Sequence, residues 1–147
     1  MRATDVSRFW HAERAEQLRW VSTLGAVAAV RVGLHICSLR QLATIMGLSV
    51  GDAAVAQSLC TQAEALAVAR CVRGVLARWP SQSECLVGAL AAGCLLRRQR
   101  PQLLIGVRGR APQIAAHAWL EVNGARLHIT DADVNADFVA LRRARAA

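Results

Sequence analysis

Apolar and polar positions separate a helical N-terminal half of the chain from a strand-rich C-terminal part. Trp20 to Val30 contains no charged residue, and this run is much shorter than the roughly 20 apolar residues that span a membrane. It predicts a buried helix in preference to a contact with a membrane surface. Ser38 to Val50 predicts a second, short helix, which closes at Gly47 or in the turn from Ser49 to Asp52.

The next segment, from Asp52 to Arg78, predicts a longer helix with two different faces. Its apolar side chains recur every three or four residues, as on the buried stripe of an amphipathic helix. The stripe comprises Val68, Val72, Val75, Leu76 and Trp79, whereas Arg70, Arg73 and Arg78 fall away from it. We interpret these arginines as a solvated face.

The uncharged run from Cys85 to Leu96 predicts the central helix of the fold. A helix this short without any charge is expected to be buried on most sides. Ser81, followed three residues later by Glu84, has the capping-box pattern, which predicts that the helix begins at Ser81. Pro101 ends it.

Beyond Pro101 the apolar period changes from that of a helix to that of a strand. Leu103 to Val107 predicts one strand, and Arg108 to Gln113 predicts a mobile loop. Ala116 to Val122 alternates, with one face made of His117, Trp119 and Glu121 and the other made of Ala118, Leu120 and Val122.

Asn123 and Gly124 predict a tight two-residue hairpin turn, which fixes the register of the returning strand. The expected cross-strand pairs are Glu121 with Arg126, Trp119 with His128, and His117 with Thr130. After Asp137, the run from Phe138 to Leu141 predicts a final helical turn.

These elements predict an α+β fold in which the central helix packs on a small antiparallel sheet. The 147 residues are enough for a single domain with a real core. We expect a helical part over residues 1–80, a core that carries the chemistry over 81–131, and a C-terminal extension over 132–147.

Arginine carries all of the positive charge. The chain has 18 basic residues, none of them lysine, against 10 acidic ones, and its formal net charge is +8. This balance suits an acidic partner or substrate, nucleic acid included. The arginines are scattered, however, and cluster only at Arg97 to Arg100 and at Arg142 to Arg145.

The five cysteines are an odd number without paired short spacings, and no secretory signal opens the chain. A reduced cytoplasm fits this pattern best. No Cys-x-x-Cys or His-x-x-x-His pair is present to supply neighbouring ligands, so we expect neither a metal ion nor another cofactor.

Cys85 is the candidate nucleophile. In the first turn of the central helix, unpaired backbone N–H groups and the positive end of the helix dipole favour a thiolate. The same amides are able to stabilise an oxyanion. The competing interpretation is a small buried side chain, which is how we interpret the remaining cysteines, Cys37, Cys60, Cys71 and Cys94.

His117 is the candidate general base, because imidazole is the side chain that most often plays this role. The competing interpretation is a half-exposed strand residue. A third group normally orients such a base, and Asp131 is the nearest acid, with Asp133 as the alternative. Strict alternation turns Asp131 to the apolar face, so this role requires a bulge or a strand that ends at Thr130.

The ordered combination of Cys85-Leu86-Val87, the strand from Leu104 to Arg108 and the hairpin from His117 to Gly124 resembles the lasso-peptide leader peptidases. These are the transglutaminase-like cysteine proteases of lasso-peptide biosynthesis, and the resemblance extends roughly from Arg70 to Asp131. It implies a papain/transglutaminase-like core and removal of the leader from a ribosomally made precursor peptide.

By this resemblance Cys85 attacks the scissile carbonyl, His117 transfers the proton and an aspartate orients the imidazole. A separate cyclase would close the macrolactam. Because residues 1–80 are predicted to be helical, we expect leader recognition to reside in a separate protein that docks on this one. The chain departs from the family in its acid, since family members often carry theirs closer to the histidine than Asp131.

Three classes of function are therefore compatible with the sequence. The first is a cysteine endopeptidase for leader removal. The second is a transglutaminase-like acyltransferase that uses the same Cys85 and His117. The third is a non-enzymatic, arginine-rich module that binds nucleic acid with steep salt dependence and without need of Cys85.

Overall fold

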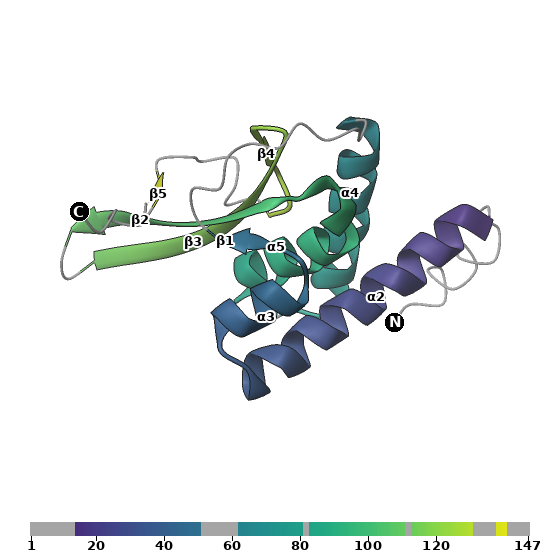
Figure 1. Ribbon diagram of the computed structural model, residues 1–147, viewed down its shortest axis with the longest axis horizontal. Helices are drawn as coiled ribbons and strands as arrows, with labels where there is room; N and C mark the ends of the chain where they lie inside the picture. Colours follow the sequence, from purple (N-terminus) through teal and green to yellow (C-terminus); the bar gives the residue numbers. More distant parts are fainter. Residues whose placement is uncertain (1–13, 51–61, 81–82, 111–112, 131–137, 141–147) are drawn as a thin grey trace.

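A layer of helices packs on one side of a mixed sheet, and the hairpin of β2 and β3 extends beyond the helices (Figure 1). This computed structural model describes residues 14–50, 62–80, 83–110, 113–130 and 138–140. The helices are α2 (Arg14–Ile36), α3 (Leu39–Ile45), α4 (Gln62–Arg78) and α5 (Glu84–Leu95), with a short 3-10 helix, η1 (Arg97–Gln99). The strands are β1 (Ser49–Val50), β2 (Gln102–Arg110), β3 (Gln113–Val122), β4 (Ala125–Leu127) and β5 (Val139–Ala140). The predicted α+β class is confirmed.

The sheet has the strand order β1-β2-β3-β4, and β5 also pairs with β2. Three of the four strand pairings are antiparallel, as expected, whereas β1 runs parallel to β2, with Ser49 opposite Gln102. The expectation of helices throughout residues 1–80 is wrong at the same place. Helix α3 ends at Ile45, and Gly47, with φ of +75°, turns the chain toward the sheet.

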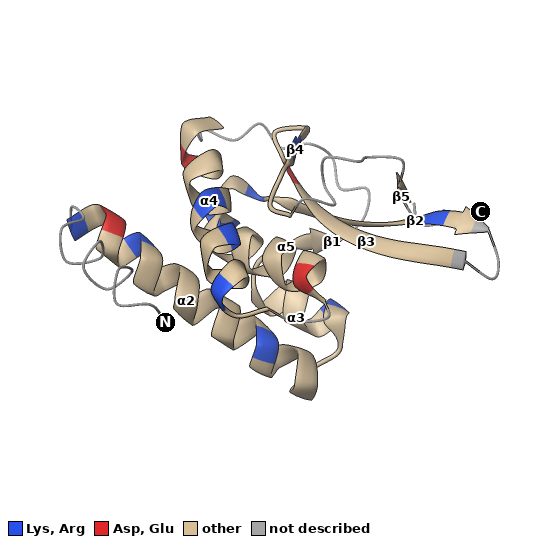
Figure 2. Ribbon diagram, turned by 180° about the vertical axis from the view of Figure 1, so that it is seen from behind, with Lys and Arg blue, Asp and Glu red and all other residues tan. Residues whose placement is uncertain are grey.

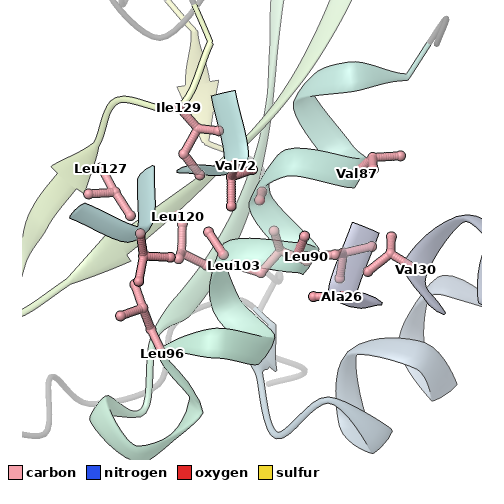
Figure 3. Close-up of a cluster of buried hydrophobic side chains, with 14 of the residues drawn as sticks. Ala26, Val30, Val72, Val87, Leu90, Leu96, Leu103, Leu120, Leu127 and Ile129 are labelled. Carbon is pink, nitrogen blue, oxygen red and sulfur yellow. The ribbon is translucent and has the colours of Figure 1, made fainter. Parts of the chain in front are cut away.

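Helix α5 is the centre of the core, as predicted. It packs against α2, α4, β2 and β3. Figure 3 shows Leu90, Leu103 and Leu120 together between α5 and the sheet, and all three are fully buried. Complete burial of each such side chain contributes about 1.5–3 kcal/mol.

The start of α5 differs from the prediction. The helix begins at Glu84, and its N-cap is Ser83, which makes no side-chain capping bond. Ser81 lies outside the described residues. Cys85 is therefore the second residue of the helix, still within the first turn.

Helix α4 confirms most of the predicted stripe. Val68, Val72, Val75 and Leu76 are buried. Trp79 is an exception, because it follows the last helical residue and is 44% exposed. The Arg31 guanidinium lies over its ring, 4.3 Å from the centroid. The predicted helical stretch from Asp52 is described only from Gln62 onward, and residues 51–61 lie outside the described part.

The uncharged stretch of α2 is buried on one face only. Thr23, Ala26, Val27, Val30 and Gly33 face the core. The opposite face carries exposed apolar side chains: Leu18, Val21, Val32 and Ile36. No helix in the described part of the chain is both long enough and apolar enough to cross a membrane.

Candidate functional site

Helix α5, which carries Cys85 in its first turn, crosses beneath the sheet. A Cβ atom on Gly93 would meet Leu48, which precedes β1. A Cβ atom on Gly88 would lie 3.0 Å from Ile129, which follows β4. The helix therefore runs from the β4 side of the sheet, at its start, to the β1 side. Cys85 precedes Gly88 by about one turn, so it belongs to the end of α5 that lies on the β4 side of the sheet. The edge of β3 that faces away from β2 is here called the outer edge of β3.

The thiol of Cys85 is half-buried and lies in the first turn of α5. The first bond of α5 runs from the Val87 N–H to the Ser83 carbonyl. The N–H groups of Cys85 and Leu86 therefore have no acceptor within the helix, as is usual for a first turn. The position of Cys85 in the first turn is as predicted, and its role as a nucleophile stays a prediction.

His117 lies in the middle of β3 and is only 3% exposed. The interpretation as a half-exposed strand residue is therefore wrong. Its ring stacks with that of Trp119 at 6.2 Å between centroids, and the Phe138 ring lies 5.0 Å away. Phe138 comes from the segment that leads into β5, so a distant part of the sequence covers the histidine.

Alternation along β3 follows the prediction, but both faces of the strand are covered. Ala118, Leu120 and Val122 join the hydrophobic core. His117 and Trp119 lie on the opposite face. There the Arg126 guanidinium lies 3.9 Å from the centroid of the Trp119 ring, and the Trp119 indole donates a hydrogen bond of 3.1 Å to Glu121.

The predicted hairpin turn is confirmed. Asn123 and Gly124 have φ values of +54° and +77°, which a tight two-residue turn requires, and Glu121 pairs with Arg126. The ladder ends at Leu127, however, so the predicted pairs that involve His128 and Thr130 are not part of it.

Arg73 on α4 accounts for the early end of β4. Its Nε donates a 3.0 Å hydrogen bond to the Ile129 carbonyl, and its Nη2 donates one of 3.1 Å to the His128 carbonyl. Continued pairing would have directed the Ile129 carbonyl toward β3. The guanidinium therefore binds an acceptor that a longer β4 would use.

Two further expectations about this region are wrong. The segment Arg108 to Gln113 was expected to be a loop, but β2 continues to Arg110 and β3 starts at Gln113, with these two residues paired. Only Ala111 and Pro112 between them lie outside the described residues.

The C-terminal segment also differs from the prediction. Val139 and Ala140, expected in a helical turn, form β5 and pair with β2 at Val107 and Gly106. Leu141 lies outside the described residues. Gly106 permits this contact, since a Cβ atom there would lie 2.8 Å from the Val139 carbonyl oxygen.

The predicted acids, Asp131 and Asp133, both lie outside the described residues, so their role stays a prediction. The pairing of Cys85 with His117 also stays a prediction, although α5 packs against β3. Sequence reasoning missed Phe138, Arg73 and Gly106 as neighbours of the site. Among these three, Gly106 carried a signal, because a glycine inside a strand often marks a close approach.

The other described cysteines differ from Cys85 in their surroundings. Burial raises the pKa of the Cys71 thiol above its ordinary value. Cys37 and Cys94 are half-buried and pack against the core, as expected, and Cys60 lies outside the described residues. Within the described ranges, no group of three potential metal-ligating side chains could hold a metal ion.

Comparison with known proteins gives one match. A family model described as the transglutaminase-like superfamily matches residues 26–143. The match begins within α2, at residue 26, and includes all of α5, β2, β3 and β4. No curated protein and no solved structure matches the chain.

Proposed function

The chain belongs to the transglutaminase-like superfamily, and from this premise we propose that it is a cysteine endopeptidase that removes the leader from a lasso-peptide precursor. Domains of this superfamily are typically cysteine proteases or acyltransferases. The observation that carries the proposal is that Cys85 lies in the first turn of α5, a helix that packs against the strand that contains His117.

In the proposed reaction the Cys85 sulfur attacks the scissile carbonyl carbon. His117 accepts the thiol proton and delivers it to the leaving amine, which gives a thioester on Cys85. Water then attacks the thioester, His117 accepts a proton from the water, and the thiol is restored as the carboxylate product leaves. The N–H groups of Cys85 and Leu86 are the donors for the negatively charged oxygen in both steps.

The proposed site is at the outer edge of β3. Helix α5 packs on one face of the sheet, whereas the His117 ring belongs to the opposite face. The proposed proton transfer therefore requires Cys85 and His117 to meet around the outer edge of β3. Asp131 directly follows Thr130 in the sequence, and we assign it the role of orienting the imidazole, with Asp133 as the alternative.

The proposal includes a separate leader-binding protein and a separate cyclase. The exposed face of α2 offers an apolar surface for a docked protein: Leu18 is 69%, Val32 60% and Ile36 75% exposed. Apolar surfaces of this kind on monomers often mark interaction sites.

The test is a cleavage assay with a lasso-peptide precursor, its leader-binding protein and the full chain, analysed by mass spectrometry. The expected product is the free leader, which carries one added water. Cys85→Ala and His117→Gln are expected to abolish its formation. Cys94→Ala, on the same helix, and His128→Gln, beyond β4, are matched controls that should retain it. Cleavage that persists in Cys85→Ala would refute the assignment.

Acyl transfer is the second candidate, because the superfamily includes acyltransferases. Adding a primary amine to the same assay separates the two reactions, since a transferase gives a product whose mass includes the amine. Asp131→Asn and Asp133→Asn, compared in this assay, rank the two acids by lost turnover.

A nucleic-acid-binding module is less well supported. Figure 2 shows the arginines spread over α2, α4 and β2. Four of them lie over aromatic rings: Arg31 over Trp79, Arg78 over Trp20, Arg108 over Phe138 and Arg126 over Trp119. Guanidinium groups held in this way contribute to packing, and they do not form a single basic surface.

A further inference from the structure

The outer edge of β3 is covered by β4 over a short length only. Strand β4 pairs with β3 between Leu120 and Val122, whereas β2 pairs with β3 on the other side from Gln113 to Glu121. Between Ile114 and Ala116, no strand in the described part of the chain pairs with the outer edge of β3. Figure 1 shows this portion of the hairpin projecting past the helices.

The geometry of the hairpin turn identifies the backbone groups that point outward. In the two-residue turn, Val122 and Ala125 are the flanking residues that exchange hydrogen bonds. Because N–H and C=O directions repeat every second residue along a strand, those of Ile114 and Ala116 also point to the outer edge. Those of Ala115 point to β2.

Among the described residues, none of the usual protections against strand pairing is present at this edge. Natural proteins commonly protect free edges with charged side chains, proline, bulges or a covering segment. Ile114, Ala115 and Ala116 carry no charge, and Ile114 is 62% exposed. An uncharged, extended and unpaired edge is a template for another strand.

We propose that the outer edge of β3 binds the peptide substrate as an added strand, through the backbone of Ile114 and Ala116. This inference rests on the proposed endopeptidase function and deepens it. Strand addition supplies affinity through main-chain hydrogen bonds, so it requires an extended substrate but no particular sequence. The small side chains of Ala115 and Ala116 leave room for larger substrate side chains on both faces.

The location of the edge favours a substrate peptide over a second copy of this chain. Ala116 is adjacent to His117 in β3, and the start of α5 with Cys85 lies toward the same edge. A peptide paired with Ile114 and Ala116 would therefore continue directly into the proposed site. Two copies, each with a net charge of +8, would repel each other on approach.

Charge near this edge also indicates what kind of peptide it suits. Arg108 is exposed on β2 beside this portion of β3, with its guanidinium over the Phe138 ring. An extended peptide with acidic side chains would find a cation close to the edge, so the geometry favours acidic peptides over basic ones.

The first measurement is amide hydrogen exchange by NMR on the full-length Cys85→Ala protein, with and without a lasso-peptide precursor and its leader-binding protein. The amides of Ile114 and Ala116 are expected to exchange rapidly in the free protein and to become protected when the precursor is added. The amide of Ala115 is an internal control, since it already bonds to β2 and should be slow in both states.

The second measurement compares cleavage kinetics of two variants at one position. Ala116→Pro removes an outward N–H, which an edge strand tolerates, and should raise KM about tenfold with little change in kcat. Ala116→Val keeps the amide and should raise KM less. Circular dichroism and thermal melting check that both variants fold.

The outcomes separate this inference from the proposed function. Protection of Ile114 and Ala116 together with the KM effect supports strand addition. Cleavage by the wild-type protein without protection and without the KM effect overturns it and leaves the function intact. Protection without any cleavage supports strand addition and removes the peptidase function. If neither protection nor cleavage is observed, strand addition and the peptidase function are both overturned. Protection that depends only on protein concentration assigns the edge to a second copy of the chain.

Discussion

Replacing Gly106 with alanine tests how tightly β5 covers the histidine. Gly106 lies opposite His117 in the β2–β3 ladder and pairs with Ala140 of β5 on its other side. A Cβ atom here would lie 2.7 and 2.8 Å from two ring atoms of Trp119 and 2.8 Å from the Val139 carbonyl oxygen. The indole can shift, but a backbone carbonyl cannot move without its strand. The substitution must therefore displace β5 or strain the sheet.

The expected magnitude follows from two opposing effects. Overpacking of this kind costs about 1–3 kcal/mol. Replacing glycine inside a strand stabilises the folded state by about 0.5–1 kcal/mol, because the unfolded chain loses conformational freedom. We expect Gly106→Ala to lower the free energy of unfolding by about 1–2 kcal/mol and to raise the reactivity of His117 toward diethyl pyrocarbonate.

The assay is urea denaturation followed by tryptophan fluorescence, with histidine modification mapped by mass spectrometry. Gly25→Ala on α2 is the matched control, because nothing lies within 4 Å of the added Cβ. In a helix that change should stabilise the protein by up to about 1 kcal/mol. If Gly106→Ala is as stable as the wild-type protein and His117 is no more reactive, the tight contact between β5 and β2 is refuted.

Other perturbations test the core, the end of β4 and the cysteines. Leu90→Ala should destabilise the protein by about 2–5 kcal/mol in urea denaturation, since Leu90 is fully buried, and a loss well below this range would contradict the central position of α5. Arg73→Ala should lower the free energy of unfolding by about 1–3 kcal/mol, because two hydrogen bonds are lost. Arg70→Ala, at an exposed position on the same helix, should change the free energy of unfolding little. Burial raises the pKa of the Cys71 thiol. Above the ordinary thiol pKa the folded state therefore holds a proton that the unfolded state has lost, and the stability of the protein should fall as the pH rises through this range. Melting temperatures across an alkaline series should show a smaller fall for Cys71→Ala than for the wild-type protein. Trace iodoacetamide should modify Cys85, which is half-buried, faster than Cys71, and the reverse order would count against Cys85 as the nucleophile.

Elements with a strong local period were predictable from the sequence. The central helix, the strand with His117 and the turn at Asn123 and Gly124 all follow from patterns within a few residues. The helix start was misplaced by three residues because the capping-box pattern at Ser81 resembles a true cap, whereas the cap is Ser83. Helix boundaries depend on backbone geometry that side-chain pattern specifies weakly.

Elements created by tertiary contact were not predictable in this way. Strands β1 and β5 have two residues each and exist because they pair with β2. The polar and glycine-containing segment at Arg108 reads locally as a loop, but pairing with β3 extends the strand through it. The early end of β4 depends on Arg73, which is 55 residues earlier in the sequence than His128.

The same distinction applies to the candidate site. The roles predicted for Cys85 and His117 follow from residue type and local element, and they stay predictions. The burial of His117 follows instead from Phe138 and from Trp119 beneath Arg126. No local pattern around His117 indicates this cover.

The two covered faces of β3 restrict how a substrate can reach the proposed catalytic groups. The face with Ala118 and Leu120 is sealed against the helices, and the face with His117 and Trp119 is nearly fully buried, at 3% and 4% exposure. A peptide approaching either face would have to displace packed side chains. The outer edge, beyond the end of β4, offers backbone groups without such a cost. Within the described part of the fold, the outer edge is therefore the direction from which a peptide can reach β3 without displacing packed side chains.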